Sequence, residues 1–144
     1  MENNELKKIY DNPLHIRYMN NPSEELVLEA VKRNGLAIKY INNPSNYVKE
    51  VAIKNNPLAV EYIEDLGEEN SILAVRLLWN SLKYIKNPTN KVKLEALNAK
   101  GWAIQFIENP TEEMQLKAVS KDYDSIKYIK EPSEEVQLAA IKKY

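Results

Sequence analysis

The sequence predicts an all-α solenoid of about six and a half helix–turn–helix repeats in a single domain, residues 1–144. Three observations predict this fold. Prolines recur at positions 22, 44, 88, 110 and 132, so the chain aligns with itself every 22 residues without a gap. Alanine recurs eight residues after each of these prolines, and the alternation of apolar and polar residues that marks strands is absent.

The repeat divides the chain into units that we number from position 0, the proline, which Leu66 replaces in one unit. The first unit is degenerate, and the last stops after about half a repeat. The units are 1–21, 22–43, 44–65, 66–87, 88–109, 110–131 and 132–144.

Each unit begins with residues that favour the start of a helix. Position 1 is Ser or Thr in five units, and glutamates follow at positions 2 and 3 in most units. The hydroxyl can cap the first N–H groups of the helix, and the carboxylates favour its dipole. In an alternative register, the asparagine before the proline is the cap and the proline is the first helical residue. The sequence leaves both registers open.

Apolar residues at positions 4 and 8 and at positions 6 and 9 fall on two sides of this predicted helix of about 11 residues. A helix that is apolar on two sides packs on two sides. We expect the alanine at position 8 to mark the closest approach of neighbouring helices.

A second, shorter helix of about two turns follows a break at position 13, which is Gly or Pro in most units. Position 16 is aliphatic and position 18 is Tyr or Phe in every unit. So short a helix is marginal alone in water and must stack on its neighbours. Tight turns then predict two layers of antiparallel helices.

The Pro-Ser/Thr cap, the central Ala-Val and the Gly-initiated second helix resemble short α-solenoid repeats of the HEAT-like and leucine-rich-variant kind. They are also similar to short helical repeats of proteins from phages and AT-rich bacteria. The resemblance covers the whole chain. It implies a scaffold for contact with macromolecules and transfers no catalytic residue.

The sequence offers little for catalysis or metal binding. It has no Cys and one histidine, His15, and it lacks a glycine-rich phosphate-binding motif. Glutamate pairs recur with the repeat, whereas a catalytic pair should occur once. We expect a non-enzymatic protein without metal or cofactor. The net charge of −1 and the lack of an apolar run of about 20 residues or a signal peptide favour a cytoplasmic protein without membrane contact.

Large apolar residues that the repeat does not require are clustered in and after the unit 66–87. Clusters of Trp and Tyr are typical of interface hot spots, so we expect them to lie along one edge and anchor a protein partner. The alternative is that an irregular central unit needs bulky filler. The residues are Leu77, Leu78, Trp79, Trp102 and Tyr123.

Two columns of the repeat are basic. Position 17 holds Arg17, Lys39, Lys83 and Lys127, and position 10 holds Lys32, Lys54 and Arg76. Such columns form a solvated surface, a contact for an acidic protein or a path for a nucleic-acid backbone. The aromatic residue at position 18 fits a packing ladder or a base-stacking platform.

The function predicted is a protein-binding scaffold, an inhibitor or adaptor of a phage or bacterium. The alternative is a nucleic-acid backbone binder that uses the basic columns. Val136, Leu138 and Ile141 in the last half repeat lack the short helix that would cover them. This suggests a homodimer formed through that end.

Overall fold

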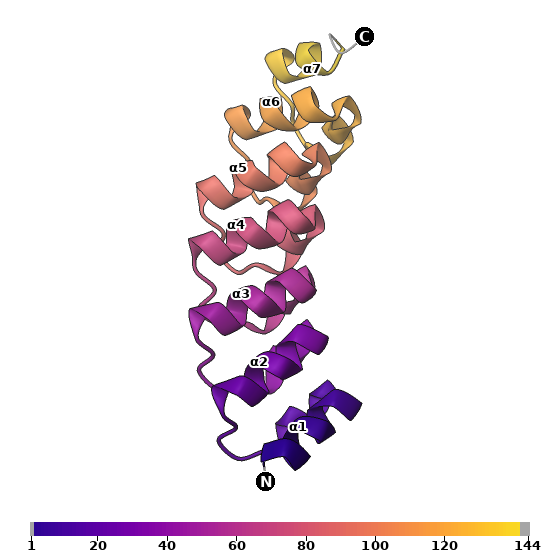
Figure 1. Ribbon diagram of the computed structural model, residues 1–144. Helices are drawn as coiled ribbons and strands as arrows, with labels where there is room; N and C mark the ends of the chain where they lie inside the picture. The colour runs from indigo at the N-terminus through magenta and orange to yellow at the C-terminus, as the bar shows by residue number, and fades with distance from the viewer. Residues whose placement is uncertain (1, 142–144) are drawn as a thin grey trace. The chain divides into compact units, whose positions relative to one another are not determined.

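The computed structural model describes residues 2–141, and within this range the chain forms helices and turns without a strand. Long α-helices alternate with short 3-10 helices in the order that the repeat predicts (Figure 1). The all-α, solenoid-type fold of repeated helix–short helix units is therefore confirmed.

The long helices have ten residues each, except the last, which has eight. They are α1 (Glu2–Asp11), α2 (Glu24–Arg33), α3 (Asn46–Asn55), α4 (Glu68–Leu77), α5 (Asn90–Ala99), α6 (Glu112–Lys121) and α7 (Glu134–Ile141). The short helices have six residues each. They are η1 (Pro13–Tyr18), η2 (Gly35–Tyr40), η3 (Pro57–Tyr62), η4 (Trp79–Tyr84), η5 (Gly101–Phe106) and η6 (Tyr123–Tyr128).

The structure decides between the two capping registers in favour of the hydroxyl. The side-chain oxygens of Ser23, Ser45, Thr89 and Thr111 accept the N–H of the residue three positions on, at 3.2–3.3 Å. In four units the asparagine before the proline at position 0 has a different role, because its backbone is left-handed, with φ between 44 and 51°. These residues are Asn21, Asn43, Asn87 and Asn109.

The turn that precedes the long helix has a different backbone conformation at the start of the unit 66–87. Here the residue with positive φ is Gly67, at 82°, which lies two residues after the usual asparagine position. Glycine adopts this region without a steric penalty. The carbonyl of Gly67 accepts both the N–H and the hydroxyl of Ser71. The replacement of Pro-Ser by Leu66-Gly67 therefore relocates the bend and leaves the following helix in place.

The second helix of each repeat lies where the sequence predicts it, but it is of the 3-10 type. In η1, η2 and η3 the side chain of an asparagine at position 12 accepts the N–H two residues on. A segment of six residues closes more i→i−3 than i→i−4 hydrogen bonds, so the tighter helix suits its length. The capping residues are Asn12, Asn34 and Asn56.

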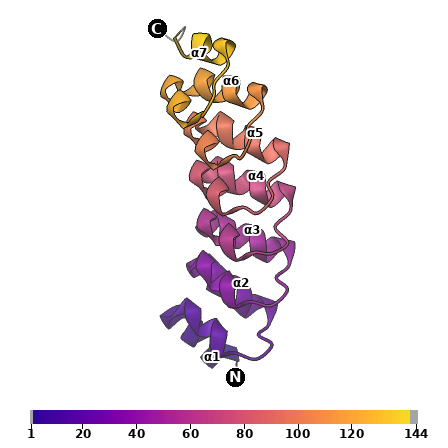
Figure 2. The ribbon, with the colours of Figure 1, turned by 180° about the vertical axis from the view of Figure 1, so that it is seen from behind.

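Contacts between Cα atoms divide the chain into two compact units, Met1–Ala74 and Val75–Tyr144, with the boundary inside α4. In the first unit α1, α2 and α3 contact one another in order, as do η1, η2 and η3. The second unit repeats this arrangement, with contacts in order along the long helices α5, α6 and α7 and along the short helices η4, η5 and η6. Each unit thus holds a row of long helices and a row of short ones (Figure 2). A single domain with two antiparallel layers throughout stays a prediction.

The core consists of the columns that the repeat predicts. The alanine at position 8 is 0% exposed in α2 to α6, which agrees with a close approach of neighbouring helices. The aliphatic residue at position 9 is also 0% exposed in these helices. The alanines are Ala30, Ala52, Ala74, Ala96 and Ala118.

Candidate functional site

The last two residues of most short helices are a basic residue and a tyrosine, and in the first unit the structure combines them into one surface. In the first unit the guanidinium of Arg17 lies 4.7 Å from the ring centre of Tyr18 and 5.5 Å from that of Tyr40. The ammonium of Lys39 lies 5.8 Å from the ring centre of Tyr40 and 5.2 Å from that of Tyr62. Each cation therefore bridges the ring of its own repeat and the ring of the next. We call these five residues the cation–tyrosine row.

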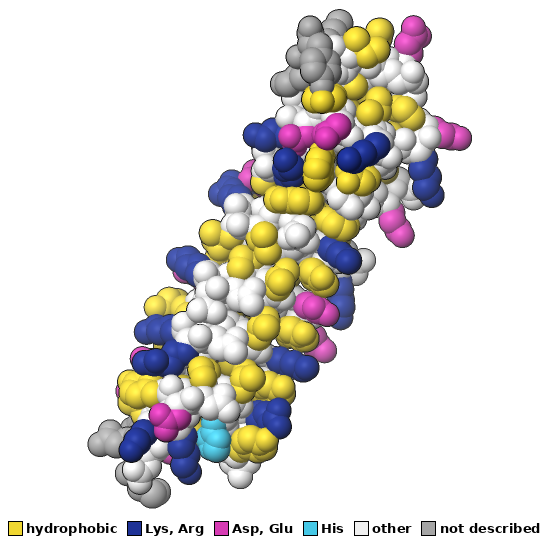
Figure 3. Space-filling model, turned by 90° about the vertical axis from the view of Figure 1, so that its right-hand side faces the viewer, with side chains coloured by type: hydrophobic (Ala, Val, Ile, Leu, Met, Phe, Trp, Pro, Cys, Tyr) yellow, Lys and Arg dark blue, Asp and Glu magenta, His cyan; other side chains and the backbone are white. Residues whose placement is uncertain are grey.

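The row is at the surface. Arg17 and Lys39 are exposed, and the Tyr18 and Tyr62 side chains are also exposed. Figure 3 shows basic side chains lying beside hydrophobic ones, a colour class that includes tyrosine. A cation over an aromatic ring at an exposed site is stabilised by about 0.5–1 kcal/mol. These contacts order the long basic side chains and keep their charges at the surface.

Hydrogen bonds to the phenol oxygens, first of Tyr18 and then of Tyr40, raise the pKa of Arg17 above its ordinary value. The guanidinium also donates a hydrogen bond to the hydroxyl of Tyr18. Within residues 2–141 neither Arg17 nor Lys39 forms an ion pair with a carboxylate. The two cations therefore have aromatic and phenolic neighbours, and no protein carboxylate neutralises them.

The second unit uses the same positions with a different pattern. Lys83 lies 5.7 Å from the ring centre of Tyr84, within one repeat. Lys127 lies 5.3 Å from the ring centre of Tyr128 and 4.8 Å from the ring of Trp102 in the preceding repeat. Position 17 of the unit between them is a glutamine, so the alternation of cations and rings is interrupted there.

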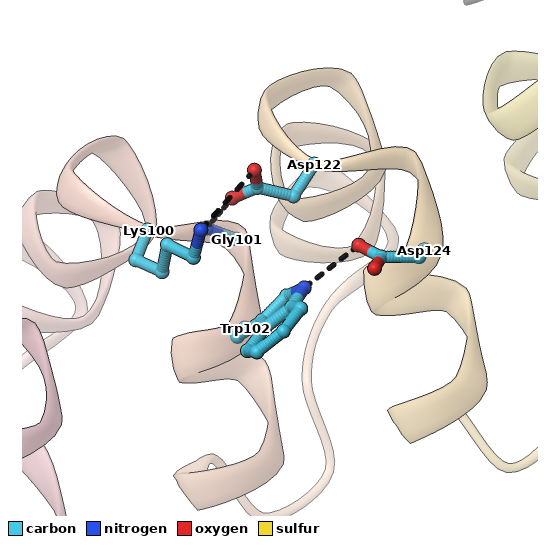
Figure 4. A network of polar contacts seen from close by, with 5 residues as sticks. All are labelled: Lys100, Gly101, Trp102, Asp122 and Asp124. Carbon is cyan, nitrogen blue, oxygen red and sulfur yellow. Dashed lines mark hydrogen bonds and ion pairs between the residues drawn. The ribbon is translucent and has the colours of Figure 1, made fainter.

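Trp102 is held by several contacts to the next repeat (Figure 4). Its indole N–H donates a hydrogen bond of 2.7 Å to the carboxylate of Asp124, and its ring meets Tyr128 edge-on at 6.3 Å. The N–H of Gly101 donates a 2.7 Å hydrogen bond to Asp122, which also pairs with Lys100 at 3.7 Å. The two aspartates at the start of η6 thus bind consecutive residues of η5. These contacts tie η5 to η6 and give Trp102 a structural role.

The other large apolar residues that the sequence predicts to anchor a partner differ in exposure. Trp79 is half-buried, and its ring stacks at 6.2 Å on the ring of Phe106 in the next repeat. Leu78 is half-buried, whereas Leu77 is 51% and Tyr123 43% exposed. Trp79, Trp102 and Tyr123 all lie at the starts of η4, η5 and η6. Their use as anchors for a partner stays a prediction.

The basic column at position 10 is separate from the row, because it lies on the long helices. Lys54 pairs with Glu50 at 3.0 Å, and Arg76 pairs with Glu95 at 2.8 Å. The hydrogen bond with Glu95 raises the pKa of Arg76, and the same bond lowers the pKa of Glu95. Lys32 is exposed. Carboxylates therefore neutralise two of the three cations of this column.

His15 is half-buried, and its ring lies 5.5 Å from that of Tyr18. The described residues contain no group of three or more His, Asp or Glu side chains that could hold a metal ion. No helix among them is long and apolar enough to span a bilayer.

Sequence reasoning treated positions 17 and 18 as separate columns and missed that they form one surface in the first unit. The signal was present in the recurring dipeptides Arg17-Tyr18, Lys39-Tyr40, Lys83-Tyr84 and Lys127-Tyr128. It also missed Lys49, a buried lysine on α3.

Comparisons with protein-family models, with curated proteins and with solved structures find no match to this chain. The function proposed below therefore rests on the structure.

Proposed function

We propose that the protein is a non-enzymatic binding module whose cation–tyrosine row docks an acidic segment of a partner protein. The observation that supports this proposal is the state of the two cations in the row. Arg17 and Lys39 are exposed, ordered by aromatic rings and without a carboxylate partner in the described chain. Tyr and Arg are also the residues enriched in the energetic centres of protein interfaces.

An acidic protein fits the row better than a nucleic acid does. Base stacking needs an open aromatic face, but the protein's own cations lie over the rings of Tyr18, Tyr40 and Tyr62. Glu61 occupies the position of the cation in η3, which breaks the positive path that a phosphate backbone needs. The net charge of −1 also disfavours binding driven by counterion release.

As a wider proposal, such a module serves as an inhibitor or adaptor of phage or bacterial origin in the cytoplasm, in the manner of HEAT-like repeats. The absence of Cys and the presence of one His in the sequence support a non-catalytic role. The proposal of a homodimer rests on α7. Ile141 is 67% exposed, whereas its equivalents at position 9 in α2 to α6 are 0% exposed. A light-scattering mass of one chain at high concentration would contradict the dimer.

The function is tested by titrating the protein into two fluorescein-labelled probes and measuring their anisotropy. One probe is an acidic peptide of alternating Glu and Ser, and the other is an oligothymidylate of equal length. We expect the peptide to bind with a Kd of about 10–100 μM and the oligothymidylate to bind at least about tenfold more weakly. Tighter binding of the oligothymidylate, with an affinity that falls steeply with salt, would instead establish the nucleic-acid alternative.

A further inference from the structure

Lys49 is the one charged residue that is buried within the described part of the chain, with 8% of its surface exposed. It occupies position 5 of its repeat, on α3. Its ammonium donates a hydrogen bond to the carbonyl of Asp65. An ammonium has three N–H donors, and within residues 2–141 this is the one protein acceptor that Lys49 uses. No carboxylate forms an ion pair with it in that range.

Lys49 lines a groove between two successive inter-repeat loops, residues 41–44 and 62–65, with a volume of about 640 Å³. Comparable grooves lie between loops elsewhere and are lined by the residue at the same repeat position. That residue is Val27 in a groove of about 570 Å³ and Gln115 in one of about 950 Å³. Position 5 therefore differs in chemistry from groove to groove, and Lys49 places a cation in this one.

We propose that this groove, the Lys49 groove, binds a carboxylate, and that it seats an Asp or Glu side chain of the acidic segment. The inference rests on the proposed function, because Lys39 and Tyr62 of the cation–tyrosine row line the same groove. Lys49 is a buried residue whose ammonium has unused donors, and a carboxylate would supply both an opposite charge and the acceptors. Position 5 would then help to select the partner.

Two acidic residues, Glu64 and Asp65, also line the groove, and both are exposed. Their repulsion of a ligand grows with the charge of the ligand, so it is about twice as large for a dianion as for a monoanion. The attraction of Lys39 and Lys49 grows by the same factor, so the charges that line the groove give a dianion no net advantage. Removing a dianion from water costs more than removing a monoanion, and the groove therefore selects a carboxylate over a phosphate. This contrast can be measured.

The test uses the full chain with 13C-labelled lysine and follows the Cε signals by NMR at constant ionic strength. The probes are sodium acetate and sodium phosphate at a pH where phosphate is the dianion, each replacing sodium chloride. We expect the Lys49 signal to shift saturably with acetate, with a Kd of about 10 mM, and at least about fivefold more weakly with phosphate. The exposed Lys32, in the same unit, is the control. A Lys49 shift no larger than that of Lys32, or equal affinity for both anions, would overturn the proposal.

The double variant Glu64→Gln/Asp65→Asn changes exposed side chains and leaves Lys49 in place. It should tighten phosphate binding about five- to tenfold and acetate binding about two- to threefold. Equal gains for both anions would contradict the proposed selectivity. Failure of acetate binding with intact binding of the acidic peptide would overturn this inference alone, whereas loss of peptide binding with intact acetate binding would overturn the proposed function.

Discussion

Two buried serines in the second unit are predicted to lower the free energy of unfolding. Ser81 and Ser125 are 0% exposed, and their hydroxyl oxygens have no hydrogen-bond partner. They occupy repeat position 15, where the equivalent residues Ala37, Ala59 and Ala103 are also 0% exposed. The site therefore accommodates a methyl group, and the hydroxyl adds a desolvated polar atom that gains nothing in return.

Replacing each serine by alanine removes that atom and leaves a void no larger than one oxygen. Burial of an unpaired hydroxyl costs about 1–3 kcal/mol, so we expect each substitution to raise the free energy of unfolding by about 1 kcal/mol, and the two together by about 2 kcal/mol. The reverse change, Ala103→Ser, should lower it by about 1–3 kcal/mol.

The assay is urea unfolding followed by tryptophan fluorescence. Both tryptophans, Trp79 and Trp102, lie in the second unit together with the three substituted residues, so the signal reports on the unit that is changed. The midpoint should rise at an unchanged slope. A lower stability of Ser81→Ala or Ser125→Ala would refute the reasoning, because it would mean that the hydroxyl is hydrogen-bonded in the native protein.

Two further predictions concern close packing and pH. A Cβ at residue 101 would lie 2.3 Å from the carbonyl oxygen of Ala118, so Gly101→Ala should lower the free energy of unfolding by about 2–4 kcal/mol. Gly67 has open space around it but a φ of 82°, so Gly67→Ala should lower it by about 1 kcal/mol. Urea unfolding that ranks the two variants in the opposite order would contradict this. The lowered pKa of Glu95 means that its pair with Arg76 stabilises the fold above the ordinary carboxyl pKa of about 4.3, and that this stability is lost as the pH falls through the lowered value. Glu95→Gln should therefore lower the free energy of unfolding by less than about 1 kcal/mol at pH 7 and leave it unchanged at pH 2. A difference between wild type and variant that stays constant across that range would contradict a stabilising pair of Glu95 with Arg76.

The repeat made most of the fold predictable from the sequence. A column compared across several units samples one environment repeatedly, so the alanine at position 8 identified its buried role. The hydroxyl at position 1 marked a helix start but left two capping registers open. The type of the short helix was not predictable in this way, because its apolar positions fit two turns of either helix. Neither was the bend at Gly67, since it departs from the pattern at Asn43 and its equivalents.

The candidate sites depend on contacts between repeats, which an alignment of repeats does not show. The bridging of Tyr18 and Tyr40 by Arg17 requires that the repeats lie at a particular spacing. The hydrogen bond from Trp102 to Asp124 joins position 14 of two successive repeats, which is neither Trp nor Asp in the other repeats. For the same reason, the sequence predicts a binding anchor at Trp102 but does not show its contacts to η6.

The most direct test of the account is the affinity of the acidic peptide for two charge-reversal variants of the first unit. Arg17→Glu/Lys39→Glu changes the row, whereas Lys32→Glu/Lys54→Glu makes the same change in net charge on the long helices. With folding of both variants verified by circular dichroism, we predict that the row variant binds at least about tenfold more weakly, a loss of about 1.4 kcal/mol, and the control less than about threefold. Equal weakening of both variants would contradict the claim that the cation–tyrosine row is the binding surface.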